Sequence, residues 1–151
     1  MTAPLLIVAV GNPSRGDDAL GPALLERAEV ALAGEIAAGR VELLTDFQLQ
    51  IEHALDLVGR ERVIFVDASV SAPAPFEWTE LAAGEGVAAS ITHAMTPAAV
   101  LDTYRKVVGA PPPAAQLAIR GERFELGEDL SDAARANLDA ALSSLVARAR
   151  G

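Results

Sequence analysis

The residues in this chain best suited to chemistry are acidic side chains that follow predicted strands. The apolar run LLIVAV leads into GNPSRGDDALGP at residues 11–22, where Gly11 and Gly16 have the spacing of a phosphate-binding loop. Such a loop needs Lys and Ser or Thr where this chain has Asp17 and Asp18. Two carboxylates repel a phosphate and attract a cation, so the loop favours a metal over a nucleotide.

Two further aspartates, Asp46 and Asp67, follow the predicted strands at 41–45 and 63–66. The carboxyl ends of parallel strands meet at one edge of a sheet, which is where ligands bind in α/β proteins. Aspartate also caps helix N-termini, and for any one of these residues that structural role explains its position about equally well. Asp18 lies near a predicted helix start, whose positive end favours the ionised carboxylate that a metal ligand must be.

His93 is the histidine that fits a site with these carboxylates. It lies in SITHAMTP, just before the Thr96-Pro97 helix start. A neutral imidazole beside two carboxylates makes an incomplete ligand set, which leaves positions open for water or substrate. Spacing alone favours an ordinary hydrogen-bonded loop histidine. His53 falls off the apolar stripe of its predicted helix, so we expect it to be exposed to solvent.

Other catalytic patterns are absent. The chain has no HExxH, no GxGxxG and no GxSxG, which leaves Ser69 a weak candidate nucleophile. The absence of Cys excludes a disulfide, a thiolate metal site and a cysteine nucleophile. Asp17 and Asp18 are adjacent, so their side chains point apart and do not form an aspartic dyad.

Composition predicts one domain, residues 1–151, with an aliphatic core. The chain is 51% hydrophobic but only 4% aromatic, which is typical of helices packed on a sheet. A net charge of -9 argues against a nucleic-acid partner. The N-terminal apolar run is too short to span a bilayer. We therefore expect a soluble cytoplasmic protein without membrane or nucleic-acid partners.

Strand and helix patterns alternate along the chain, which predicts an α/β fold with a mostly parallel sheet covered on both faces. The strands are expected at 5–10, 41–45, 63–66, 76–81 and 116–119. One helix should begin near Leu20 and end at Gly34, and another should end at Gly59. Two more should begin after Thr96 and Ser131. The residues expected to face the core are Leu24, Ala28, Ala31 and Leu32; Ile51, Ala54, Leu55 and Val58; Val100, Leu101, Tyr104 and Val108; and Leu138, Leu142 and Leu145.

Taken together, these motifs resemble the hydrogenase maturation endopeptidases, which trim the C-terminal tail of the large subunit of nickel–iron hydrogenases. Three stretches carry the resemblance: GNPSRGDDALGP, VIFVDAS around Asp67 and SITHAMTP around His93. Their order and separation match the family. The resemblance implies a three-layer α/β/α fold with a twisted five-stranded sheet, mostly parallel, whose one antiparallel strand is 76–81.

The resemblance also implies a site. Asp18, Asp67 and His93 correspond to the residues that engage nickel in the unprocessed large-subunit precursor, and we predict them as catalytic and metal-binding residues. Nickel is then supplied with the substrate. Asp17 or Asp46 could orient a water. Many relatives have a glycine pair after the strand-two acid, whereas FQLQ follows Asp46 here, which should change which large subunit is accepted.

Three alternatives stay open from the sequence. The three residues could sense nickel while another group performs the chemistry. The chain could be a non-catalytic chaperone that checks the metal site, or a small-molecule metallohydrolase.

Overall fold

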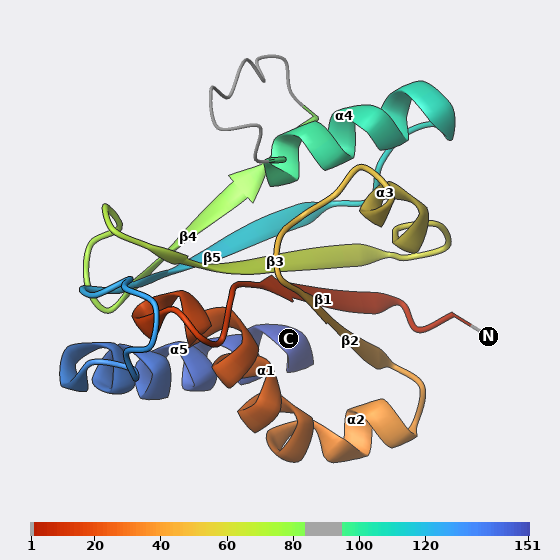
Figure 1. The fold of residues 1–151 in the computed structure, drawn as a ribbon. Helices are drawn as coiled ribbons and strands as arrows, with labels where there is room; N and C mark the ends of the chain where they lie inside the picture. Colours follow the sequence, from red (N-terminus) through yellow and green to blue (C-terminus); the bar gives the residue numbers. More distant parts are fainter. Residues whose placement is uncertain (1, 84–94) are drawn as a thin grey trace.

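A computed structural model describes residues 2–83 and 95–151 (Figure 1). Five strands form one sheet in the order β2-β1-β3-β5-β4. Their bounds are β1 Leu5–Val10, β2 Val41–Asp46, β3 Arg62–Ser69, β4 Phe76–Leu81 and β5 Ala114–Arg120. All neighbouring strands are parallel except β4, which pairs antiparallel with β5 at the edge. The expected mostly parallel sheet with one antiparallel strand is confirmed.

Helices cover both faces of this sheet. In Figure 1, α1 and α5 lie below the sheet, and α3 and α4 lie above it. The helices are α1 Leu20–Ala31, α2 Ala33–Ala37, α3 His53–Asp56, α4 Pro97–Val107 and α5 Asp132–Arg150, with a 3-10 turn, η1, at Gly16–Ala19. The expected three-layer α/β/α arrangement is therefore confirmed. None of the helices in residues 2–83 and 95–151 is long and apolar enough to cross a membrane.

The sequence of the central strand β1 is continuously apolar because both faces of the strand are buried. Leu5, Ile7 and Ala9 belong to the core between the sheet and the helices α1 and α5. Leu6 and Val8 belong to the second core, between the sheet and the helices α3 and α4. Because both faces of a parallel strand are buried, every side chain must be apolar.

The residues expected to start the helices α4 and α5 do so in the structure. Pro97 is the first residue of α4, and the Thr96 hydroxyl accepts a hydrogen bond from the Ala99 N–H at 3.1 Å. Ser131 caps α5 in the same way through the N–H of Ala134. The helix end expected at Gly59 is different in the structure: α3 ends at Asp56, and Gly59 closes the turn that follows, with a φ of +81° that favours glycine. These signals position the loops that carry the site.

The structure differs from two further helix predictions. Gly34 does not end the helix that starts at Leu20. That helix ends at Ala31, and Gly34 lies within the short α2. Val108, expected in the core at the end of α4, is 48% exposed. Periodicity does not mark the residue at which a helix ends.

The segment 51–58 turns a different face inward from the one expected. Ile51, Leu55 and Val58 are exposed, whereas His53 is only 6% exposed. The stripe is rotated by about one residue, so that Leu57 is fully buried in place of Val58. A buried histidine is tolerated where its ring nitrogens have partners. His53 has such partners, so the expectation that it is solvated was wrong.

Candidate active site

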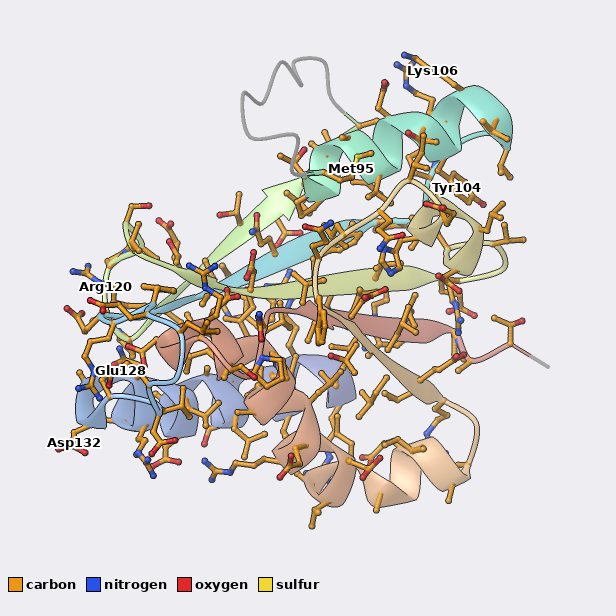
Figure 2. All side chains as sticks on the ribbon, in the orientation of Figure 1. Met95, Tyr104, Lys106, Arg120, Glu128 and Asp132 are labelled. Carbon is orange, nitrogen blue, oxygen red and sulfur yellow. The ribbon has the colours of Figure 1, made fainter. Side chains whose placement is uncertain are left out.

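The structure brings two of the predicted residues together. Asp18 and Asp67 line one pocket of about 480 Å³ at the end of the sheet where β1 and β2 finish. The other lining residues are Val10, Gly11, Phe47, Gln48, Leu49, Met95, Thr96, Pro97 and Gln116. Met95 lies at the N-terminal end of α4, beside the sheet (Figure 2). The pocket therefore collects residues from β1, β3, β5, η1, the start of α4 and the loops next to these elements.

Asp18 is held by the start of the glycine loop. Its Oδ2 accepts a hydrogen bond from the Asn12 N–H at 2.8 Å. A Cβ on Gly11 would lie 2.0 Å from the carbonyl oxygen of Asp18, and Gly11 has a φ of +151°. Only glycine allows the two backbones to approach this closely. The loop residues thus fix both the backbone and the carboxylate of Asp18.

Asp67 lies within β3 rather than beyond its end, and its surroundings change its acidity. Burial raises the pKa of Asp67 to about 7, and the negative charge of Asp18 acts in the same direction. A hydrogen bond from the Ala68 N–H to Oδ1, at 2.8 Å, only partly opposes this. A carboxyl group with a pKa near neutrality can take up and release a proton at working pH.

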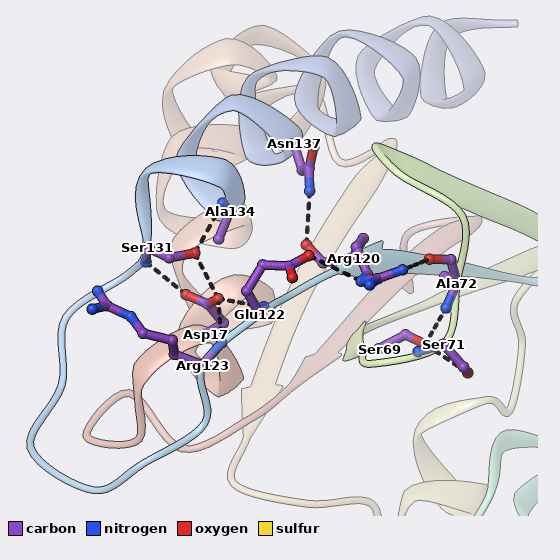
Figure 3. Close-up of polar contacts among 10 residues, drawn as sticks. All are labelled: Asp17, Ser69, Ser71, Ala72, Arg120, Glu122, Arg123, Ser131, Ala134 and Asn137. Atoms are coloured by element: carbon purple, nitrogen blue, oxygen red, sulfur yellow. Dashed lines mark hydrogen bonds and ion pairs between the residues drawn. The ribbon is translucent and has the colours of Figure 1, made fainter.

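Asp17 lies outside this pocket and has a structural role. It is completely buried, and its carboxylate accepts hydrogen bonds from the N–H groups of Glu122, Arg123 and Ser131 and from the Ser131 hydroxyl (Figure 3). Burial alone would raise the pKa of Asp17, but these hydrogen bonds outweigh it and hold the pKa below its usual value. Because Asp17 is fully buried and does not line the pocket, its carboxylate cannot reach a water in the pocket, and the prediction that it orients this water has no support.

Asp46 also lies outside the carboxylate pocket. Its Oδ1 accepts a hydrogen bond from the Phe47 N–H at 2.7 Å, and its Oδ2 lies 3.3 Å from Nε2 of His53. The side chain thus organises the loop after β2. The prediction that Asp46 orients a water has no support in this arrangement, because Asp46 is absent from the residues that line the pocket.

His93 lies outside the described residues, so its predicted place beside Asp18 and Asp67 stays a prediction. Within the described parts of the chain, no three His, Cys, Asp or Glu side chains are close enough to hold a metal ion. The two carboxylates therefore form a partial donor set. Met95, Thr96 and Pro97, which follow His93 closely in the sequence, line the pocket.

Beside the carboxylate pocket lies a second, mostly apolar groove of about 310 Å³. Its lining residues are Gly11, Pro13, Pro22, Thr45, Asp46 and Phe47. Gly11 and Phe47 line both hollows. Phe47 is 68% exposed. An apolar ring in this position is available to a peptide that enters the pocket.

Sequence reasoning missed two parts of the site. Gln116 lines the pocket from β5, and its only signal is a polar residue at the start of an apolar predicted strand. The loop 121–131 anchors Asp17, and nothing in the sequence connects the two. A Cβ on Gly121 in this loop would lie 2.8 Å from Cβ of Asp17, so the close contact also depends on glycine.

Solved structures share this fold along nearly the whole chain. The hydrogenase maturating endopeptidase HybD from Escherichia coli matches with a TM-score of 0.74 and 25% identity, covering 99% of this chain and 93% of that one. The [NiFe] hydrogenase maturation protease HycI from Thermococcus kodakarensis matches with a TM-score of 0.70 and 18% identity over 99% and 94%. HybD from the same archaeon matches with a TM-score of 0.63 and 21% identity over 99% of each chain.

No protein-family model and no curated protein sequence matches the chain. The likeness that these comparisons find is therefore carried by the three-dimensional arrangement. The family resemblance drawn from the sequence is confirmed: this chain has the fold of the hydrogenase maturation endopeptidases over nearly its entire length.

Proposed function

We propose that this chain is a cytoplasmic endopeptidase that removes the C-terminal extension from a nickel–iron hydrogenase large-subunit precursor after nickel has been inserted. The observation that supports this most strongly is the meeting of Asp18 and Asp67 in one pocket. These are the described residues that the family motifs single out. The endopeptidases with the same fold include E. coli HybD, which is 25% identical.

The two carboxylates suit a divalent ion that arrives with other ligands of its own. Nickel takes mixed nitrogen and oxygen donors, and a partial set of two carboxylates leaves room for an imidazole and for the ligands of the precursor. Nickel, as part of the substrate, can polarise a carbonyl group or lower the pKa of a bound water. Recognition of the metal-loaded precursor then depends on the carboxylates, and a deep side-chain pocket is unnecessary.

The residues of this chain supply oxygen donors and hold them in position. Asp18, oriented by Asn12, contacts the substrate metal through its carboxylate. Burial raises the pKa of Asp67 to about 7 in the free protein, so this group releases its proton when it provides a second oxygen to the metal. In the hydrolysis, water adds to the scissile carbonyl carbon and the C–N bond breaks. The proton lost by water passes to the leaving amine.

His93 completes the proposed set as an imidazole donor. Its support is the sequence motif SITHAMTP together with the pocket-lining position of Met95, two residues later. His93→Ala should then reduce processing as strongly as Asp18→Asn. Normal processing by the His93→Ala variant would contradict the role of His93 and would mean that the two carboxylates act without it.

The test is to incubate the protein with its large-subunit precursor in nickel-loaded and nickel-free forms and to measure the mass of the product. We expect shortening of the loaded form only. Cleavage of both forms would contradict nickel sensing. Binding of the loaded form without cleavage would contradict the endopeptidase assignment and support a chaperone that checks the metal site.

A further inference from the structure

His53 is a buried polar side chain that takes no part in the carboxylate pocket. The residue is only 6% exposed, although it lies in a surface helix of four residues. Both ring nitrogens face polar partners. Nδ1 accepts a hydrogen bond from the Gln50 N–H at 2.8 Å, and Nε2 lies 3.3 Å from Oδ2 of Asp46. These two partners are the ends of the segment 46–50.

This segment forms one wall of the candidate active site. Phe47, Gln48 and Leu49 all line the pocket that contains Asp18 and Asp67. The middle of the segment makes no strand or helix. Leu49 is buried in the second core, and the two ends of the segment are held by His53, which contacts both Asp46 and Gln50. The other Asp46 carboxylate oxygen accepts the Phe47 N–H at 2.7 Å.

The same segment is joined to the loop that carries Asp18. The carbonyl oxygen of Asp46 accepts a hydrogen bond from the Gly11 N–H at 3.1 Å. Gly11 in turn packs directly against the backbone of Asp18. A displacement of the segment 46–50 would consequently alter the pocket wall first and could reach Asp18 through Gly11.

We propose that His53 is a positioning residue that holds the segment 46–50 as the wall recognising the precursor polypeptide. The proposal rests on the proposed function for the identity of the ligand. His53 does not touch the substrate. It acts by accepting the Gln50 N–H and by directing Nε2 at Asp46. Loss of these contacts loosens the wall, which weakens binding of the precursor more than it slows the chemical step.

The shape of the imidazole allows the two contacts to be separated. In His53→Asn, the side-chain oxygen can occupy the place of Nδ1 and accept the Gln50 N–H. In His53→Gln, the amide reaches towards Asp46 but offers no acceptor near Gln50. His53→Leu fills the buried space and removes both contacts. Glu52→Gln, at an exposed neighbouring position, is the matched control.

The first measurement follows amide hydrogen exchange at residues 47–50 in the free full-length protein. We expect exchange of the Gln50 amide to rise about tenfold or more in His53→Leu and His53→Gln, and to stay near the wild-type rate in His53→Asn and Glu52→Gln. Circular dichroism checks that each variant is folded. Unchanged exchange in folded His53→Leu and His53→Gln would overturn the positioning role.

The second measurement uses the nickel-loaded precursor. His53→Leu should raise KM about tenfold while kcat changes by less than about threefold, and His53→Asn should restore most of the affinity. A loss of kcat at unchanged KM would overturn the proposal. If the wild-type protein cleaves nothing, the proposed function fails, and the dissociation constant of the precursor then takes the place of KM. Equal dissociation constants for wild type and His53→Leu would overturn the role of His53 in recognition.

Discussion

Asp17 and Ser131 are joined by two hydrogen bonds, one from the Ser131 N–H to Oδ1 and one from its hydroxyl to Oδ2, each 2.7 Å long. The same hydroxyl accepts the N–H of Ala134 at the start of α5. The cap of the C-terminal helix is thus tied to the glycine loop. In the acidic pair of this loop, Asp17 anchors the backbone while Asp18 faces the pocket.

Removing the anchor should therefore destabilise the protein. Asp17→Asn replaces an acceptor of four hydrogen bonds with a group that also carries donors, so some of the buried N–H groups lose their partner. We expect the free energy of unfolding to fall by about 2 to 4 kcal/mol. Chemical denaturation measures this change. Asp129→Asn, exposed in the loop 121–131, is the control and should change stability by less than about 0.5 kcal/mol.

The raised pKa of Asp67, caused mainly by burial, predicts a pH dependence of stability. Between the ordinary pKa near 4 and the folded-state pKa of about 7, the folded protein holds a proton that the unfolded chain releases. Stability contributed at this position therefore falls as pH rises through that range. Relative to Asp67→Asn, the wild-type protein should lose roughly 2 to 4 kcal/mol between pH 4 and 7.

Denaturation of the two proteins at a series of pH values tests this. The Asn variant should be the more stable one at pH 8, although it is expected to be inactive. The Asp18→Asn variant should lose less unfolding free energy between pH 4 and 7 than the wild-type protein does. The reason is that the charge of Asp18 contributes to the raised pKa of Asp67. Parallel pH profiles for wild type and Asp67→Asn would contradict the account.

Gly11 should tolerate no side chain. A Cβ there would lie 2.0 Å from the Asp18 carbonyl oxygen, so Gly11→Ala must displace the loop that holds Asp18. We expect a loss of about 2 to 4 kcal/mol in unfolding free energy and a large loss of processing. Gly34→Ala is the control, because Gly34 lies in α2 and a Cβ added there would meet nothing within 4 Å. That variant should be stabilised by about 0.5 to 1 kcal/mol.

Phe47 should contribute to binding of the precursor. Its ring is exposed and lines both the carboxylate pocket and the apolar groove. Phe47→Ala should raise KM about tenfold with little change in stability, because the ring buries apolar surface only in the complex. Val30→Ala, which removes an exposed apolar side chain from α1, is the control and should leave KM unchanged. An unchanged KM in Phe47→Ala would mean that the precursor polypeptide does not contact Phe47.

Much of the fold follows from local signals in the sequence. β1 is apolar at every position because both of its faces are buried, and that pattern predicts a central parallel strand. Thr96-Pro97 and Ser131 mark their helix starts because each cap accepts a hydrogen bond from the residue three positions later. The face of the segment 51–58 could not be predicted, because it depends on partners that let His53 be buried.

Some residues of the candidate site could also be predicted from the sequence, and others could not. Asp18 and Asp67 could be predicted because each follows a strong strand signal and the ends of parallel strands converge. The anchoring role of Asp17 could not be predicted, since its partner Glu122 lies 105 residues away in the sequence. Position in a motif does not distinguish a carboxylate that faces a pocket from one that is buried under a loop.

The central claim is that Asp18 and Asp67 act together on one substrate, and a double-mutant cycle tests it most directly. The measurement is the single-turnover rate of shortening of the nickel-loaded precursor by wild type, Asp18→Asn, Asp67→Asn and the double variant. We expect each single change to lower the rate about 100-fold or more, and the double change to lower it little further. A double variant whose loss is the product of the two single losses, or a single variant with the wild-type rate, would contradict the claim.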